Sequence, residues 1–139
     1  MNDFTEKVKI SASLMCVDWL NARKEIEILN QEKVDYLHID VIDGKYAPDF
    51  TMGTSIINCF RDIFDGPFDH HLMVEEPSNL FDTFEIRPGD RFCMHPECCR
   101  NLHRDLIELR KKGIIVYVVD GQKRFTWVIP FYKLVIYCT

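Results

Sequence analysis

A short stretch of alternating apolar and ionisable residues, 36–44, constrains this chain more than any other feature. In an extended strand the apolar residues of this stretch share one face, and His38 and Asp40 share the other. A second apolar stretch, 68–73, carries His71 near its end. Imidazole and carboxylate groups suit Zn²⁺, Mn²⁺, Fe²⁺ or Co²⁺. If the two strands are neighbours, the sequence predicts part of a metal site at one edge of a sheet.

Size and charge narrow the class of protein. The chain has 139 residues, enough for one domain, and a net charge of −5 with acidic and basic residues interspersed. No basic stripe offers a surface for nucleic acid or anionic lipid. Residues 1–9 lack the apolar stretch of a secretory signal, and no run reaches the roughly 20 apolar residues of a membrane helix. The six cysteines include no CxxC pair and are interpreted as reduced thiols in a cytoplasmic protein.

Hydrophobic periodicity predicts strands that alternate with helices. Strands are expected at 9–14, 34–41, 68–73, 91–95 and 114–119, and helices at 18–32, 55–64, from 77 onward, and 101–112. The first helix is expected to bury four residues on one face: Trp19, Ala22, Ile26 and Leu29. This spacing implies parallel βαβ units, in either an open doubly wound sheet or a (β/α)₈ barrel. Polar residues at the strand ends favour the barrel.

Four segments, each at the end of a predicted strand, resemble the ribulose-phosphate 3-epimerase family. They are SASLMCVD at 11–18, HIDVIDGKYAPDFTMG at 38–53, HHLMVEEP at 70–77 and MHPE at 94–97. The resemblance covers about residues 9–118. Within the family, Leu-Met-Cys at 14–16 together with His-Pro-Glu at 95–97 favours the allulose-6-phosphate 3-epimerase type.

The resemblance implies a fold and an activity. The fold would be an α/β, partial (β/α)₈ TIM barrel, with about the first four βα units and part of strand five. The activity would be inversion of one carbon of a ketose phosphate, ribulose 5-phosphate or allulose 6-phosphate. In the family, protons are abstracted and returned through an enediolate with the help of one divalent metal ion: Zn, Mn, Fe or Co. The implied partner is this small molecule, without nucleic acid or membrane, and self-association is left open.

The resemblance also assigns roles to individual residues. His38, Asp40 and His71 would be metal ligands, and Asp40 would also be a catalytic acid/base carboxylate. Ser13, His71 and Met73 would bind substrate.

The chain departs from the family in length and at several positions. A complete barrel needs roughly 200 residues or more, so we expect a truncated chain: a barrel portion at 1–119 and a non-matching tail at 120–139. The family's second acid/base aspartate, on the seventh strand, and its phosphate site have no counterpart. We therefore expect weak or no activity. Ala12, Ile42, Lys45 and Tyr117 replace a usual Pro, Met, His and Gly.

Three alternatives compete with this interpretation. The first is a non-catalytic half barrel that needs a partner to cover its sheet edge. The second is a relative of orotidine-phosphate decarboxylase, which is disfavoured because no lysine stands between Asp40 and Asp43. The third is a zinc-binding interaction module. Its ligands would be His95, Cys98, Cys99 and His103.

Overall fold

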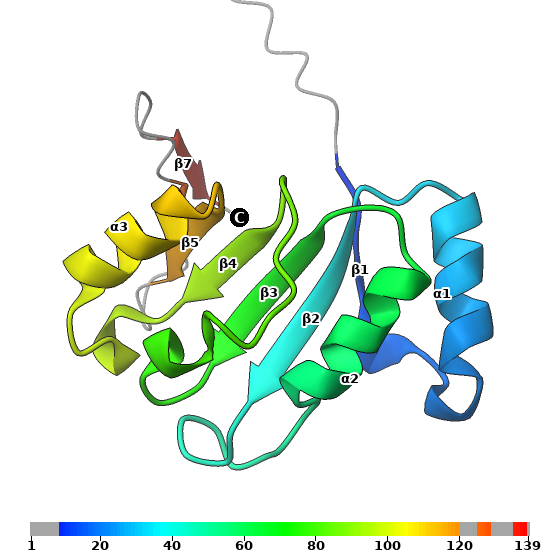
Figure 1. Cartoon of the computed structure of the whole chain (residues 1–139), viewed down its shortest axis with the longest axis horizontal. Helices are drawn as coiled ribbons and strands as arrows, with labels where there is room; N and C mark the ends of the chain where they lie inside the picture. The colour runs from blue at the N-terminus through cyan, green and yellow to red at the C-terminus, as the bar shows by residue number, and fades with distance from the viewer. Residues whose placement is uncertain (1–8, 120–124, 129–134, 139) are drawn as a thin grey trace, which may run out of the picture.

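The computed structural model describes residues 9–119, 125–128 and 135–138. They form a seven-stranded sheet in which the strands follow one another in sequence order (Figure 1). The parallel strands are β1 Ser11–Ser13, β2 Tyr36–Ile42, β3 Phe68–Met73, β4 Arg91–Met94 and β5 Ile115–Val119. Two antiparallel strands follow, β6 Phe125–Val128 and β7 Val135–Cys138. The parallel α/β arrangement expected from the sequence, that of a partial TIM barrel, is confirmed.

Helices and short 3₁₀ turns connect the parallel strands. The α-helices are α1 Ala22–Gln31, α2 Thr54–Cys59 and α3 Leu102–Lys111. The 3₁₀ turns are η1 Leu14–Cys16, η2 Trp19–Asn21, η3 Phe60–Asp62, η4 Pro77–Leu80 and η5 Pro96–Cys98. Side-chain caps set three of these starts, the first at η1, where Ser13 accepts a hydrogen bond from the Met15 amide. Asp18 accepts a hydrogen bond from the Leu20 amide at 3.0 Å, and Asn101 accepts one from the Arg104 amide at 3.1 Å.

One predicted core residue lies elsewhere. Trp19 is 46% exposed, whereas Ile26 is fully buried. The cause is the 3₁₀ turn before α1: its three residues per turn take Trp19 out of line with the apolar face of the α-helix. The Trp19 ring instead lies 6.4 Å from the ring of Phe60.

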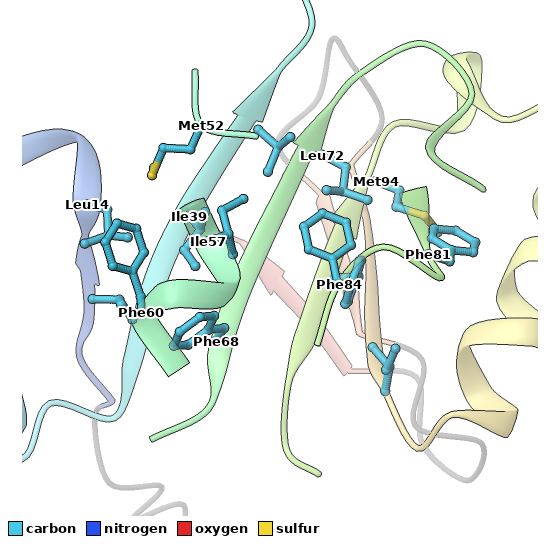
Figure 2. Packing of buried hydrophobic residues seen from close by; sticks show 14 of the residues in the cluster. Leu14, Ile39, Met52, Ile57, Phe60, Phe68, Leu72, Phe81, Phe84 and Met94 are labelled. Carbon is cyan, nitrogen blue, oxygen red and sulfur yellow. The ribbon is translucent and has the colours of Figure 1, made fainter. Parts of the chain in front are cut away.

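The core lies between one face of the sheet and the helices (Figure 2). Ile26 of α1, Ile57 of α2 and Leu109 of α3 are fully buried in one cluster with the apolar strand residues. The strand side chains in this cluster include Leu37, Ile39, Phe68, Leu72, Phe92, Met94, Val116 and Val118. The three helices therefore bury their apolar stripes on the same side of the sheet. Within the described part of the chain, no helix is long and apolar enough to cross a bilayer.

The opposite face of the sheet is polar and only half-buried. Strand alternation places His38 and Asp40 of β2 on this face, next to Asp69 and His71 of β3. In a closed (β/α)₈ barrel, this face lines the interior. The predicted metal ligands therefore lie on the side of the sheet away from α1, α2 and α3.

Candidate metal centre

The register between β2 and β3 brings the predicted ligands together. His38 pairs with Asp69, and Asp40 pairs with His71, in neighbouring parallel strands. The end of β2 is fixed by Thr51, whose hydroxyl donates to the Asp40 carbonyl at 2.7 Å and accepts from the Ile42 amide at 2.8 Å. These contacts hold the backbone that directly follows the Asp40 side chain.

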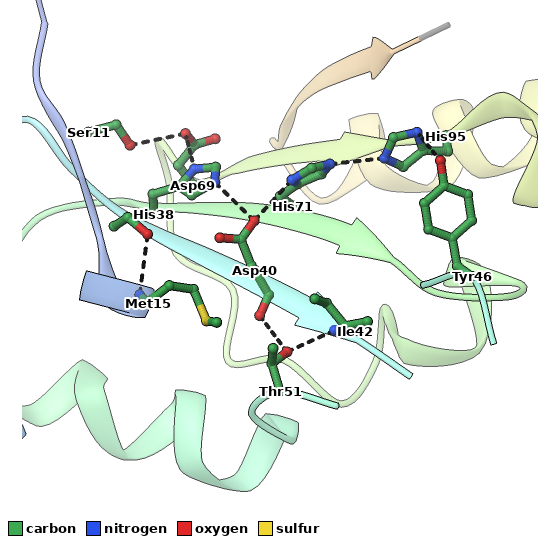
Figure 3. A network of polar contacts seen from close by, with 11 residues as sticks. Ser11, Met15, His38, Asp40, Ile42, Tyr46, Thr51, Asp69, His71 and His95 are labelled. Atoms are coloured by element: carbon green, nitrogen blue, oxygen red, sulfur yellow. Dashed lines mark hydrogen bonds and ion pairs between the residues drawn. The ribbon is translucent and has the colours of Figure 1, made fainter. Parts of the chain in front are cut away.

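His38, Asp40 and His71 converge on one point (Figure 3). Each offers one ligand atom, and these atoms all lie within 4.8 Å of one another. The Oδ1 atom of Asp40 lies 3.2 Å from Nε2 of His38 and 3.0 Å from Nδ1 of His71. Within residues 9–119, 125–128 and 135–138, this is the one such group of three or more His, Cys, Asp or Glu side chains.

The electrostatics of the cluster follow from its hydrogen bonds. The hydrogen bond to Asp40, and then that to Asp69, raise the pKa of His38 to about 9. The same contact with His38, followed by that with His71, holds the pKa of Asp40 far below its usual range. Burial would raise the pKa of Asp69, but the hydrogen bond and charge of His38 outweigh it and lower that pKa. The two carboxyl groups are therefore carboxylates at neutral pH.

Each imidazole of the cluster has a second partner outside it. Nδ1 of His38 lies 3.0 Å from Oδ2 of Asp69, which also accepts from the Ser11 hydroxyl at 3.1 Å. Nε2 of His71 lies 2.9 Å from Nε2 of His95. Asp69 was not among the predicted site residues, although its position two residues before His71 places both side chains on one face of a strand.

This arrangement fits a divalent transition metal. The donor set is two imidazoles and one carboxylate, which suits Zn²⁺, Mn²⁺, Fe²⁺ or Co²⁺. A metal-ligating histidine almost always donates its other N–H to a neighbouring acceptor. His38 and His71 each keep one nitrogen toward Asp40 and place the other against Asp69 or His95.

The two remaining predicted site residues lie on the same polar face. Ser13 pairs with His38 in the sheet, and its hydroxyl accepts from the Met15 amide at 3.2 Å. Met73 lies two residues after His71 and is half-buried at the carboxyl end of β3. The role of both residues in substrate binding stays a prediction.

The alternative zinc module is wrong for the described chain. Its four candidate residues form no group of converging ligand atoms there. The His95 side chain lies on the polar face, between His71 and Tyr46 at 2.9 Å from each. Cys99 instead donates to the His95 carbonyl at 3.4 Å, and burial raises the pKa of its thiol to about 12.

A polar groove of about 550 Å³ adjoins the cluster at the carboxyl ends of the strands. It is lined by Lys45, Tyr46, Glu75, Glu76, Glu97, Cys98, Cys99 and Arg100. The Asp43 carboxylate joins two of its walls, because it accepts from the amides of Lys45, Tyr46 and Glu75 at 2.8–3.1 Å. The three predicted metal ligands do not line this groove, but Tyr46 does, and Tyr46 contacts His95.

Comparison with known proteins finds sequence relatives over most of the chain. The family model described as the ribulose-phosphate 3 epimerase family matches residues 9–126. The chain is similar to ribulose-phosphate 3-epimerase from Bacillus subtilis (strain 168), with 33% identity over 81% of this chain and 52% of that protein. It is 34% identical to the enzyme of that name from Helicobacter pylori (strain J99 / ATCC 700824), over 81% of this chain and 51% of that protein. The match to the one from Treponema pallidum (strain Nichols) is 28% identical and covers 94% of this chain and 62% of that protein. The chain thus spans about half the length of the curated relatives it matches.

Proposed function

The chain belongs to the ribulose-phosphate 3-epimerase family, and we propose that it carries the metal-binding half-site of a ketose-phosphate 3-epimerase. The observation that carries the proposal is the convergence of His38, Asp40 and His71, whose ligand atoms lie within 4.8 Å of one another. The substrate class, ribulose 5-phosphate or allulose 6-phosphate, follows from the family and the resemblance. The cytoplasmic location stays a prediction.

His38, Asp40 and His71 would hold one divalent cation. When bound, such a cation stabilises negative charge that develops on substrate oxygen atoms. Nδ1 of His38 and Nε2 of His71 are already engaged by Asp69 and His95. The two rings are therefore held with their other nitrogens toward Asp40 before any cation arrives.

Asp40 is the proposed proton acceptor. Its low pKa keeps it ionised at neutral pH, so its carboxylate can take the proton from the carbon beside the substrate carbonyl. The electron pair of the broken C–H bond then moves to the carbonyl and gives an enediolate. Return of a proton to the opposite face of that carbon inverts it, and return from Asp40 restores the starting sugar.

We expect exchange of the proton with solvent to exceed epimerisation. Inversion requires an acid on each face of the substrate. In the described residues, the one other carboxylate beside the cluster is Asp69, and it is already held by His38 and Ser11. Asp40 alone supports removal and return of a proton on one face.

The test combines metal binding with isotope exchange. Calorimetric titration with Mn²⁺, Co²⁺ and Zn²⁺ measures the affinity of the chain. Proton NMR of ribulose 5-phosphate and allulose 6-phosphate in D₂O then follows loss of the C3 proton signal and appearance of the epimer. We expect saturable binding of one ion, metal-dependent exchange at C3 and little epimer.

Two matched variants test whether metal binding and exchange depend on Asp40. Asp40→Asn should abolish exchange and weaken metal binding, because it removes a ligand and the proton acceptor together. Asp62→Asn makes the same change at an exposed aspartate of η3, on the helix side of the sheet, and should leave both unchanged. Exchange that survives Asp40→Asn, or absence of binding by any of the three metals, would overturn the proposal.

The second candidate is a non-catalytic half barrel that needs a partner. The observation that favours it is the open edge of the sheet: among the described strands, β1 pairs with β2 alone. Size-exclusion chromatography separates the two candidates. A defined monomer or dimer is compatible with the enzyme, whereas soluble aggregates that bind no metal favour the fragment.

A further inference from the structure

A chain of hydrogen bonds leads from the polar groove to the metal ligands. The Tyr46 hydroxyl donates to Oε1 of Glu97 at 3.2 Å, and Nδ1 of His95 lies 2.9 Å from the same hydroxyl. Nε2 of His95 lies 2.9 Å from Nε2 of His71, and Nδ1 of His71 lies 3.0 Å from Oδ1 of Asp40 (Figure 3). This series of hydrogen bonds thus begins at an exposed carboxylate, Glu97, and ends at a half-buried one, Asp40.

Stacking holds the members of this chain in place. The Tyr46 and His95 rings have centroids 4.6 Å apart, tilted by 32°, and the His95 and His71 rings have centroids 5.1 Å apart, tilted by 34°. His95 is only 7% exposed. Tyr46 is brought here by the loop after β2, where the Asp43 carboxylate accepts from its amide at 3.1 Å.

Starting from Glu97, only one assignment of donors and acceptors fits this series of hydrogen bonds. A carboxylate only accepts, so the one hydroxyl proton of Tyr46 points to Glu97. The Tyr46 oxygen must then accept from the Nδ1–H of His95. A neutral His95 is left with a lone pair on Nε2, and this lone pair accepts from the Nε2–H of His71. A neutral His71 therefore presents the lone pair of Nδ1 toward Asp40.

Asp40, at the other end, would by itself favour the opposite assignment of donors and acceptors. A carboxylate at 3.0 Å attracts an N–H rather than a lone pair, so Asp40 by itself would pull the proton of His71 to Nδ1. With a proton there, Nδ1 cannot ligate a metal, because ligation by imidazole requires a free lone pair. The two ends of the chain compete for the tautomer of His71.

We propose that Glu97, Tyr46 and His95 are positioning residues that fix His71 as the Nε2–H tautomer and so keep its Nδ1 lone pair ready for the metal. The inference rests on the proposed function only in that the Nδ1 lone pair of His71 is taken to bind the metal. The direction of the hydrogen bonds is a property of the metal-free protein. Tyr46 sets the direction of these hydrogen bonds, because its single hydroxyl proton is donated to Glu97.

Nitrogen-15 NMR of histidine-labelled protein tests the direction of the chain. The ring-nitrogen shifts distinguish a nitrogen that carries a proton from one that carries a lone pair. In the neutral, metal-free wild type we expect the proton on Nε2 of His71. In Tyr46→Phe, which keeps the stacked ring and loses the hydroxyl, we expect population of the Nδ1–H tautomer.

Metal affinity supplies the second readout, measured with Co²⁺ and Zn²⁺ by calorimetry. Loss of an outer partner of a ligating histidine typically weakens binding about 10- to 100-fold. We expect His95→Leu to fall in this range and Tyr46→Phe to lose about tenfold. His95→Gln should recover most of the affinity, since its side-chain oxygen can accept from Nε2–H of His71.

A matched control removes a charge from the same groove without changing any of the hydrogen bonds between Glu97 and Asp40. Glu75 pairs with Lys45 at 2.7 Å, and Glu75→Gln should leave the His71 tautomer and the metal affinity unchanged. Thermal melting of each variant verifies that the fold is retained. If Tyr46→Phe and His95→Leu fold and both keep the wild-type His71 spectrum and affinity, the proposal is overturned.

The two readouts separate this inference from the proposed function. If the wild type binds no metal but Tyr46→Phe still changes the His71 tautomer, the proposed function fails and the positioning chain stands. If the wild type binds metal and exchanges the C3 proton, while the tautomer is insensitive to Tyr46 and His95, the function stands and the positioning chain fails.

Discussion

Two adjacent histidines of β3 occupy opposite environments. His71 faces the polar side and contacts Asp40, whereas His70 is fully buried against the rings of Phe84 and Phe92, at centroid distances of 4.8 and 4.7 Å. Neither ring nitrogen of His70 has a hydrogen-bond partner. Burial, and then the charge of Arg61, lower the pKa of His70 to about 3. His70 therefore behaves as an apolar core residue whose neutral form the fold requires.

His70 should make the protein sensitive to mild acid. Its pKa is about 3 in the folded state, below the 6.5 of an unperturbed histidine, so between these values the unfolded chain binds more protons. Its contribution is complete above about pH 6.5 and is lost as the pH falls toward 3. We expect His70→Leu to reduce the loss of unfolding free energy between about pH 7 and pH 5 by on the order of 2 kcal/mol, as measured by urea unfolding.

An exposed histidine provides the comparison. His103 lies on the solvent side of α3, and His103→Leu should keep the wild-type pH dependence. An unchanged pH dependence in His70→Leu would mean that burial of this imidazole does not contribute to acid sensitivity.

At the scale of elements, one carboxylate joins three segments of the helix-side layer. Asp90 precedes β4 and forms a fully buried ion pair with Arg61 of η3. The same carboxylate accepts from the Phe68 amide at 2.8 Å and from the Arg87 amide at 2.9 Å. It therefore connects the turn after α2 to the beginning of β3 and to the approach to β4.

Removal of the Asp90 charge should lower the stability of the fold strongly, because it leaves the buried Arg61 guanidinium without its partner. We expect Asp90→Asn to lower the unfolding free energy by about 3–5 kcal/mol. Asp82→Asn breaks an ion pair with Lys112 in which the Asp82 side chain is 85% exposed, and should cost at most about 1 kcal/mol. Chemical denaturation measures both, and similar losses in the two variants would contradict this ranking.

The end of α3 depends on a glycine. Gly113 has φ of +76°, its amide donates to the Arg110 carbonyl at 2.9 Å, and the Ile114 amide donates to the Leu109 carbonyl at 3.2 Å. This is a Schellman motif, in which the residue after the helix is left-handed. It turns the chain directly into β5.

Replacement of Gly113 tests the conformation rather than packing, since a Cβ there would meet nothing within 4 Å. We expect Gly113→Ala to lower the melting temperature, with a loss of about 1 kcal/mol. Gly113→Asn should lose less, because asparagine tolerates the left-handed region better. Equal stability of alanine and glycine at this position would show that the backbone relaxes out of the positive φ.

At the scale of the whole molecule, the described sheet has an open edge at β1. β1 has only three residues and follows Ile10, which is 60% exposed. Ile10 contributes its carbonyl to β2 through the amides of Asp35 and Tyr36, each at 3.0 Å. An apolar residue at an open edge invites pairing with another chain, and a lysine there discourages it.

We therefore expect the wild-type chain to self-associate with increasing concentration. Ile10→Lys should shift sedimentation toward the 16.4 kDa monomer, because an edge charge must be desolvated when a second strand pairs. Leu20→Lys is a matched control at a residue that is 94% exposed and lies in η2, outside the strands. A wild type that remains monomeric over a tenfold concentration range would contradict the expectation.

Local pattern in the sequence determined the elements and the polar face. Period-two alternation in 36–44 identified His38 and Asp40 as neighbours on one strand face. The strand at 68–73 and the helix at 101–112 are confirmed within a residue at each end. These features depend on residues close together in the chain, which is why periodicity and caps are sufficient to predict them.

Only the tertiary structure decided which polar groups meet. The register of β2 against β3 places Asp69 beside His38, and the loop after β2 brings Tyr46 to His95 across 49 residues of sequence. Neither contact leaves a local periodic signal, because both depend on strand register and on the path of a loop held by Asp43. The sequence alone was enough to propose His38, Asp40 and His71 as candidate ligands, but the side chains that contact these residues from other segments appear only when distant parts of the chain pack together.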